Sequence, residues 1–205
     1  LLQHAAETLL TDLLCLRNGE EVLITADPES DPAVYRMLFS VAERAGAKPL
    51  IAMAPRLPFQ GALADPFISP AQAAMVGNCD VWVDLTFPYI AGAHAHDEAM
   101  KAGRTRYMLC GDLHADSFSR LFGMIDLDRY FAFQTAFDAV FTPGSQCRIT
   151  EPNGTDVTFT LAKPGIPKPR HIDKAGLYVV PGTLSITPDI ATVKGEIVVT
   201  SSFHE

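Results

Sequence analysis

The side chains with the clearest chemical capacity gather in His94-Ala95-His96-Asp97, followed further on by Asp112 and His114. Imidazoles at alternate positions share one face of an extended backbone, so His94 and His96 could offer two ligands to a metal ion. A third ligand could come from Asp112 or His114. An imidazole also titrates near neutral pH, which makes His94 and His96 candidates for a general base. The simpler interpretation is that both lie in an exposed loop and that His114 caps a helix.

Two carboxylates, Asp84 and Asp112, stand near the carboxyl ends of predicted strands. In an open parallel sheet this position faces the ligand crevice, so Asp84, Asp112 and His114 are candidates for binding a substrate. The same position is also the ordinary place for a helix N-cap. The chain contains no GxGxxG, GxxxxGK[ST] or GxSxG motif, which disfavours nucleotide binding through such loops and the usual serine hydrolases. With no cysteine partner and no HExxH spacing, the residues assign no metal ligand within the chain.

Short apolar segments alternate with helical patterns over the first two thirds of the chain. Asp31-Pro32 and Ser69-Pro70 each combine an N-cap residue with proline at the first helical position. This alternation predicts an α/β fold with an open, mostly parallel sheet flanked by helices. The expected strands are 22–24, 49–53, 81–85 and 106–110, and the expected helices are 1–16, 32–45, 70–76, 96–102, 117–121 and 128–139.

The pattern changes after Thr142-Pro143-Gly144, where β-branched residues begin to alternate with polar ones. Asn153-Gly154 is a hairpin signal, and the sequence predicts a smaller antiparallel β-rich lobe. The expected strands of this lobe are 147–150, 155–161, 177–180 and 194–201. We therefore expect a Rossmann-like α/β domain at 1–143 and a β-rich lobe at 144–205. A lobe that stops directly after a strand leaves an edge unpaired, so we expect it to be the start of a larger metal-binding domain that continues past Glu205.

Composition restricts the partners of the chain. The 24 acidic residues outnumber the 16 basic ones, and the net charge of −8 disfavours nucleic acid as a partner. No apolar run reaches the roughly 20 residues of a membrane span. The four cysteines have no close spacing, as is typical of reduced thiols in the cytoplasm. We expect a cytoplasmic homo-oligomer that acts on a small molecule.

Several segments together resemble the N-terminal half of a known superfamily. They are residues 22–55, 78–85 and 102–109, and the pattern P-G-x5-P-x6-G-x-I-V-V from Pro181 to Val199. The chain resembles the M29 metallopeptidases of the aminopeptidase T type and their relative 2,5-dihydroxypyridine 5,6-dioxygenase. The likeness covers nearly the whole chain, and the pattern at 181–199 is its most specific part. It implies an α/β domain followed by a β-rich domain, with most metal ligands in the second half.

The resemblance also separates two activities. The M29 peptidases carry a metal-binding Glu directly after the Gly of the pattern, whereas this chain has Thr183 after Gly182. The dioxygenase branch is therefore favoured, and it implies a mononuclear non-haem Fe(II) with His and carboxylate ligands beyond Glu205. It further implies a histidine in the loop that follows the strand near Asp84, for which His94 and His96 are the candidates. That histidine would take a proton from the ring hydroxyl while the iron binds this hydroxyl and O₂.

Three hypotheses remain. The favoured one is the N-terminal part of a ring-cleaving, iron-dependent dioxygenase of aromatic degradation that acts on hydroxylated pyridine-like rings, with the segment inactive alone. The second is an M29-like leucyl aminopeptidase. The third is a non-enzymatic binding or assembly domain.

Overall fold

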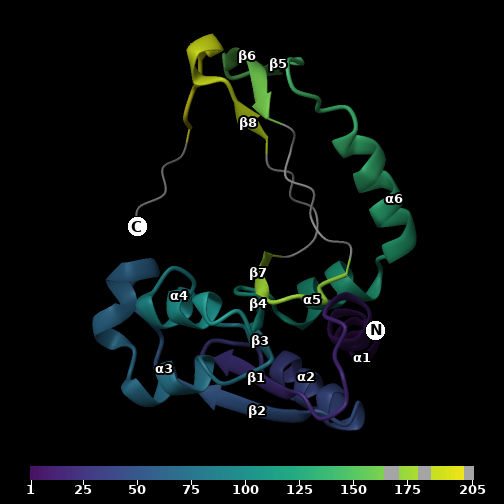
Figure 1. Cartoon of the computed structure of the whole chain (residues 1–205), viewed down its shortest axis with the longest axis vertical. Coiled ribbons are helices and arrows are strands. Elements are labelled where there is room, and N and C mark those ends of the chain that lie inside the picture. Colours follow the sequence, from purple (N-terminus) through teal and green to yellow (C-terminus); the bar gives the residue numbers. More distant parts are fainter. Residues whose placement is uncertain (164–170, 180–185, 201–205) are drawn as a thin grey trace. The chain divides into compact units, whose positions relative to one another are not determined.

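Two separate sheets organise the chain, which divides into two units (Figure 1). In this computed structural model the described residues are 1–163, 171–179 and 186–200. The first unit comprises Leu1–Ile125 with Arg170–Pro181, and the second comprises Asp126–Pro169 with Gly182–Glu205. This division differs from the predicted boundary between residues 143 and 144.

The first unit is built on a five-stranded parallel sheet of order β2-β1-β3-β4-β7. Its strands are β1 (Glu21–Ala26), β2 (Lys48–Met53), β3 (Val81–Asp84), β4 (Arg106–Leu109) and β7 (Gly176–Val179). Every pairing between neighbours is parallel. The predicted α/β fold with an open parallel sheet is confirmed. Both faces of β1 and β3 are buried, which is why these strands are apolar runs without alternation.

The strand β7 corrects one prediction. The alternation at 177–180 predicts a strand of the antiparallel lobe, but Gly176–Val179 pairs in parallel with β4, from Arg106↔Gly176 to Leu109↔Val179. A four-residue apolar segment carries no information about its partner, because the same side-chain period suits any edge of any sheet. The chain therefore leaves the first unit after residue 125 and returns to it for this strand.

Two groups of helices belong to this sheet. Helices α1 (Leu2–Glu7), α2 (Pro32–Arg44) and α5 (Ala115–Gly123) contact one another, and the π-helical turn η1 (Thr8–Leu13) continues α1. The second group contains α3 (Pro70–Val76), α4 (His94–Lys101) and the 3₁₀ segment η2 (Gly61–Phe67). Over the part of the chain that the structure describes, no helix is long and apolar enough to cross a membrane.

The helix starts predicted at Asp31-Pro32 and Ser69-Pro70 are confirmed. The Asp31 side chain accepts a hydrogen bond from the Ala33 amide at the start of α2, and Ser69 accepts one from the Gln72 amide at the start of α3. Proline is the first residue of both helices, where its missing N–H costs nothing.

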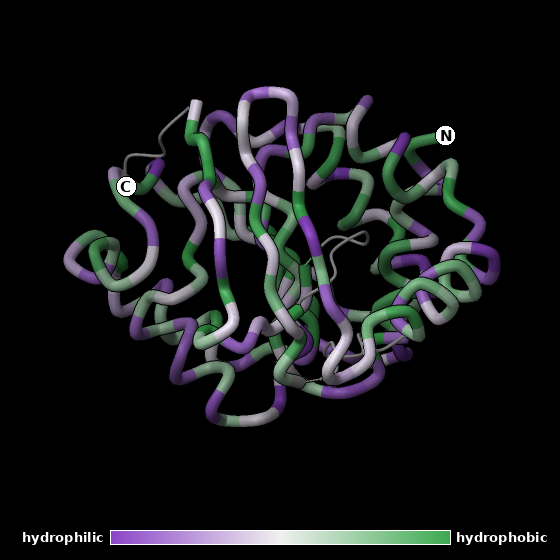
Figure 2. Tube along the Cα trace, turned by 90° about the horizontal axis from the view of Figure 1, so that it is seen from above, coloured by the Kyte–Doolittle hydropathy of each residue, from purple (hydrophilic) through white to green (hydrophobic). Residues whose placement is uncertain are grey.

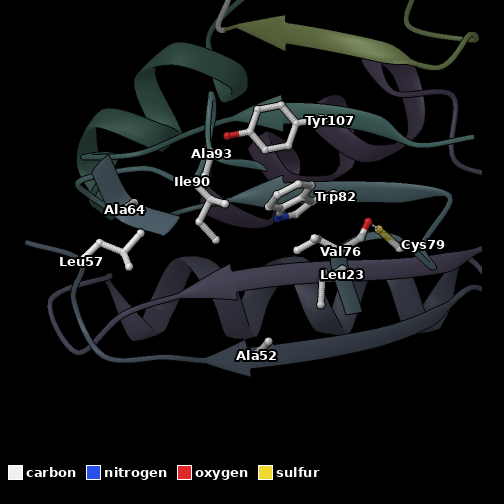
Figure 3. Packing of buried hydrophobic residues seen from close by; sticks show 10 residues of the cluster. All are labelled: Leu23, Ala52, Leu57, Ala64, Val76, Cys79, Trp82, Ile90, Ala93 and Tyr107. Atoms are coloured by element: carbon white, nitrogen blue, oxygen red, sulfur yellow. Dashed lines mark hydrogen bonds between the residues drawn. The ribbon is translucent and has the colours of Figure 1, made fainter. Parts of the chain in front are cut away.

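The core beneath α3, α4 and η2 centres on Trp82 and Tyr107 (Figure 3). Both side chains are fully buried, and their rings meet edge to face with centroids 4.5 Å apart. Ala64 of η2 and Ile90 and Ala93 of the loop before α4 belong to the same buried cluster (Figure 3). The cluster therefore joins η2 and this loop to the sheet.

The second unit contains α6 (Leu127–Asp138), the strands β5 (Gln146–Thr150), β6 (Asp156–Lys163), β8 (Thr187–Pro188) and β9 (Lys194–Glu196), and the short 3₁₀ turn η3 (Ile190–Thr192). β6 pairs antiparallel with each of the other three strands, so an antiparallel sheet follows the parallel one as expected.

Figure 2 shows how the trace of the chain repeatedly changes between hydrophilic and hydrophobic residues, as elements with one buried face require.

The hairpin between β5 and β6 turns at the predicted position. The Asn153 side chain accepts a hydrogen bond from the Thr155 amide at 3.0 Å, and Gly154 adopts a φ of +104°. Val157, Phe159 and Leu161 of β6 form the buried cluster of this unit.

Gly111, in the loop after β4, lies against the loop after β3. A Cβ added to Gly111 would stand 2.7 Å from the carbonyl oxygen of Thr86, whereas one added to Gly77 would stand 3.7 Å from the carbonyl oxygen of Ala73, an ordinary contact. We predict that Gly111→Ala lowers the free energy of unfolding by about 1–3 kcal/mol, because backbone must move to relieve the contact. Gly77→Ala is the control and should change it by less than about 1 kcal/mol. Urea unfolding of both variants checks this, and equal effects would contradict it.

Candidate functional site

The carboxyl edge of the parallel sheet carries a small cavity of about 60 Å³. Open α/β sheets place their ligands at this edge, where the loops after successive strands converge. The lining residues come from the loops after β1, β2, β3 and β4: Asp27, Glu29, Ser30, Asp31, Arg56, Leu85, Phe87, Asp112, Leu113 and His114. The structure thus brings together two of the residues predicted to bind substrate, Asp112 and His114.

Asp27 ties the loop after β1 to the loop after β3. Its carboxylate is only 2% exposed and accepts hydrogen bonds from the amides of Glu29 (2.8 Å), Ser30 (3.1 Å) and Phe87 (3.0 Å). The Ser30 hydroxyl donates to the Leu85 carbonyl at 3.0 Å, which is a second link between the loops. The sequence did not lead us to predict this role for Asp27. An Asp side chain that accepts from the amides two and three residues further along the chain is nevertheless typical of turns.

Asp31 links two helices at the cavity wall. Its Oδ1 accepts from the Ala33 amide of α2 at 2.9 Å, and its Oδ2 accepts from the Ala115 amide of α5 at 2.8 Å. The Ala115 hydrogen bond is the main reason why the pKa of Asp31 is lowered, and His114 contributes in the same direction. The N-terminus of α5, and with it His114, is therefore held by a side chain from 84 residues earlier.

Arg56 supplies a cationic side chain to the cavity lining. Its guanidinium forms an ion pair with Glu29 on the opposite loop. Asp112 is exposed and adopts a φ of +64°, a backbone conformation that aspartate tolerates better than most residues with a side chain. The exposed Asp112 and His114 thus offer a carboxylate and an imidazole to a small polar ligand.

Asp84 is placed differently from the prediction that it binds substrate. It is 0% exposed, and its two oxygens accept five hydrogen bonds. Oδ1 accepts from the Thr25 hydroxyl (2.7 Å) and from the hydroxyl and amide of Thr86 (2.6 and 3.1 Å). Oδ2 accepts from the Tyr107 hydroxyl (2.8 Å) and the Ile90 amide (3.3 Å). A carboxylate with these partners organises three strands and a loop.

The network extends from Asp84 to the aromatic core. The Trp82 indole donates to the Thr25 hydroxyl at 2.8 Å, and that hydroxyl donates to Asp84. Burial and the negative charge of Asp84 raise the pKa of the Tyr107 phenol far above its ordinary value. Tyr107 is therefore a permanent hydrogen-bond donor to Asp84 and takes no part in proton transfer near neutral pH.

His94 and His96 begin α4 and lie on different faces of it. Residues two apart in a helix are separated by about 200° around its axis, whereas they would share a face in an extended strand. His94 is exposed and His96 is only 4% exposed. The paired-ligand geometry that the HxH spacing allows is consequently not formed.

The ring of His96 is packed edge to face against Tyr107, with centroids 4.9 Å apart. Its Nδ1 lies 3.2 Å from the Gly92 amide and 3.1 Å from Asp97 Oδ1. An unprotonated Nδ1 accepts from the Gly92 amide, whereas an Nδ1 that carries a proton, in a neutral or a charged ring, donates to Asp97 instead. Its Nε2 is buried without a hydrogen-bond partner among the residues that the structure describes.

No metal centre is formed by the described part of the chain. Within residues 1–163, 171–179 and 186–200, no group of three or more His, Cys, Asp or Glu side chains is arranged to hold an ion. Two of the carboxylates that line the cavity, Asp27 and Asp31, accept hydrogen bonds from backbone amides. Thr183 and the first part of the pattern at 181–199 lie outside the described residues.

The fold and the cavity define an α/β protein of the open-sheet class with a polar site at the carboxyl edge of its strands. Residues 5–202 match the family described as NicX, 2,5-dihydroxypyridine 5,6-dioxygenase. The chain belongs to this family. No curated protein matches it.

Two solved structures share the fold. The first is 2,5-dihydroxypyridine dioxygenase from Pseudomonas putida KT2440, with a TM-score of 0.68 and 16% identity over 95% of this chain and 57% of that one. The second is wild-type AmpT from Thermus thermophilus, with a TM-score of 0.57 and 15% identity over 95% of this chain and 63% of that one. The chain thus spans about three fifths of each. The predicted resemblance to 2,5-dihydroxypyridine 5,6-dioxygenase is confirmed by the family match, and the likeness to AmpT is one of fold.

Replacing Asp84 by Asn tests the buried network. Oδ1 of Asp84 accepts a hydrogen bond from the Thr86 amide, and Oδ2 accepts one from the Ile90 amide. The NH₂ group of Asn would therefore face an N–H donor in either orientation of its side-chain amide. We predict that Asp84→Asn lowers the free energy of unfolding by about 2–4 kcal/mol. The exposed carboxylate of Asp112 is the control, and Asp112→Asn should cost less than about 0.5 kcal/mol. Similar urea midpoints for the two variants would refute the role of Asp84.

The lowered pKa of Asp31 predicts a pH-dependent stability. A carboxyl whose folded pKa lies below its unfolded value of about 3.9 stabilises the fold above that pH, and the contribution is lost as the pH falls through the folded pKa. Asn has a single side-chain oxygen, so it can accept from only one of the two amides, and it carries no charge. Wild type should therefore be more stable than Asp31→Asn at pH 7, and the difference should shrink at pH 3. Thermal unfolding at both values measures it, and a difference that is constant with pH would contradict the prediction.

Proposed function

We propose that this chain is the N-terminal part of a ring-cleaving dioxygenase that acts on hydroxylated pyridine-like aromatics. The family match over residues 5–202 is the observation that carries the proposal. The polar cavity at the carboxyl edge of the sheet supports it, because a hydroxylated pyridine offers the donors and acceptors that such a lining can bind.

Asp112 and His114 are the proposed substrate-binding groups. Both are exposed and line the cavity. The Asp112 carboxylate can accept a hydrogen bond from a ring hydroxyl, and the His114 imidazole can donate one to a ring nitrogen. Asp84 contributes indirectly, because it holds the loop that carries Phe87, another lining residue.

His94 is the proposed general base. Proton transfer requires access to the substrate, and of the two candidates His94 is exposed whereas His96 is buried against Tyr107. Removal of the proton from a ring hydroxyl makes the ring a better electron donor. An imidazole has a ring nitrogen that can accept that proton.

The family implies a metal cofactor, and the described residues do not fit one, since they contain no group of three suitable side chains arranged to hold an ion. We propose Fe(II), held by ligands in the portion of a full-length dioxygenase that this chain does not match. In this proposal residues 144–205 open the domain that holds the metal, the segment alone is inactive, and the protein is a cytoplasmic homo-oligomer that binds neither nucleic acid nor membranes.

The aminopeptidase hypothesis rests on the likeness to AmpT, which at 15% identity concerns the fold alone. The position of the peptidase Glu is occupied by Thr183. Hydrolysis of a leucine amide is therefore an outcome to be measured beside dioxygenation.

Oxygen consumption tests the proposed function. The complete natural protein, loaded with Fe(II), is expected to consume oxygen when 2,5-dihydroxypyridine is added. His94→Gln should lower kcat by about 100-fold or more, because a positioned general base contributes about that factor. His4→Gln, an exposed histidine on α1, is the control and should leave kcat unchanged. No ring-dependent oxygen uptake by the wild type would refute the dioxygenase, and hydrolysis of leucine amide would favour the peptidase.

A further inference from the structure

Three alternate backbone amides before and at the start of α4 donate to side chains from three different elements. The Ile90 amide donates to Asp84 Oδ2 of β3 at 3.3 Å, and the Gly92 amide donates to His96 Nδ1 of α4 at 3.2 Å. The His94 amide donates to Asp65 Oδ1 of η2 at 2.7 Å. Here we name Asp65, Asp84 and His96 the amide clamp.

Close packing supports the same segment. Gly92 has a φ of +83°, and a Cβ on it would stand 3.3 Å from the Cα of Gly61, which begins η2. Ile90 and Ala93 are fully buried in the cluster that also contains Ala64 of η2 (Figure 3). The path of the chain into His94 is thus restricted by hydrogen bonds and by sterics.

The clamp is also connected within itself. The ring of His96 rests edge to face on Tyr107, and the Tyr107 hydroxyl donates to Asp84. The rotamer of His96 is therefore set by the same aromatic core that the Asp84 network holds in place. Its Nδ1 is the atom that reaches the loop, while its Nε2 is buried.

Asp65 caps the start of α4, because the N-cap residue of that helix provides no capping side chain. Ala93, the N-cap residue of α4, makes no side-chain capping hydrogen bond, so the first amide of the helix would lack a protein partner without Asp65. The negative charge of Asp65 also suits the positive end of the helix dipole. His94 is exposed and stands at that first position, where helices fray most easily.

We propose that Asp65 and His96 are positioning residues that hold His94 in its reactive place, and that His96 itself is not the base. This inference rests on the proposed function, in which His94 removes the ring proton. A base must stay within hydrogen-bond reach of its proton, so loosening the clamp lowers kcat more than it changes KM.

Substitution at His96 separates positioning from catalysis. The Oδ1 of asparagine lies as many bonds from Cα as the Nδ1 of histidine, so His96→Asn keeps the acceptor for Gly92 but removes the imidazole. We expect His96→Asn to retain kcat within about threefold of the wild type and His96→Ala to lose about tenfold or more. His94→Asn should lose as much as His94→Gln. A loss in His96→Asn equal to that in His94→Asn would overturn the assignment.

Asp65 provides a second test that leaves the core intact, because its side chain is exposed. Asp65→Ala should lower kcat about tenfold with less than about a twofold change in KM, and Asp65→Asn, which keeps the capping oxygen, should restore it. The matched control is Asp126→Ala, which removes an aspartate N-cap from α6 and should leave kcat unchanged. An unchanged kcat in Asp65→Ala, or an equal loss in Asp65→Asn, would overturn the positioning role.

Amide hydrogen exchange on this 205-residue chain tests the clamp independently of activity. Exchange of the His94 amide should accelerate in Asp65→Ala and exchange of the Gly92 amide in His96→Ala, whereas both asparagine variants should stay protected. Unchanged exchange in the alanine variants would overturn the clamp. If the wild type shows no oxygen uptake but the exchange results hold, the proposed function fails and the clamp stands as a structural device.

Discussion

The buried carboxylate of Asp84 is the constraint on which the first unit depends. A charge without solvent exposure is costly unless nearby donors compensate it, and here β1, β4 and the loop after β3 each supply donors. The carboxylate and its hydrogen-bond donors each depend on the position of the other. The carboxylate needs Thr25, Tyr107 and Thr86 at these places, and their positions define where the strands end and how the loop begins.

Other carboxylates use the same chemistry on the loops around it. Asp27 binds the amide of Phe87, Asp31 binds the amide of Ala115, and Asp65 binds the amide of His94, in each case across at least 29 residues of sequence. Loop amides are the donors that a parallel sheet leaves without partners at its carboxyl edge. Aspartate is short and doubly accepting, so it can satisfy them without filling the crevice. The loops around the candidate site are thus held largely by aspartate side chains that accept backbone amides.

The arrangement of these side chains can be related to the family to which the chain belongs. The match over residues 5–202 assigns the chain to the family described as 2,5-dihydroxypyridine 5,6-dioxygenase, and AmpT shares its fold. The scaffold alone therefore does not decide the reaction. In the proposed function, the exposed groups that would meet the ligand are Asp112, His114 and His94.

The sequence by itself determined the elements whose signals are local. Asp31-Pro32 and Ser69-Pro70 start helices, apolar runs such as Val22–Ile24 are buried parallel strands, and Asn153-Gly154 turns a hairpin, because each depends on neighbours within a few residues. Tertiary structure alone decided that Gly176–Val179 joins the parallel sheet, since a short strand does not encode its partner. It also decided that Asp84 is enclosed while Asp112 is exposed, although both follow strands. The reason is that the hydrogen-bond partners that enclose Asp84 come from segments up to 59 residues away, which no local pattern can specify.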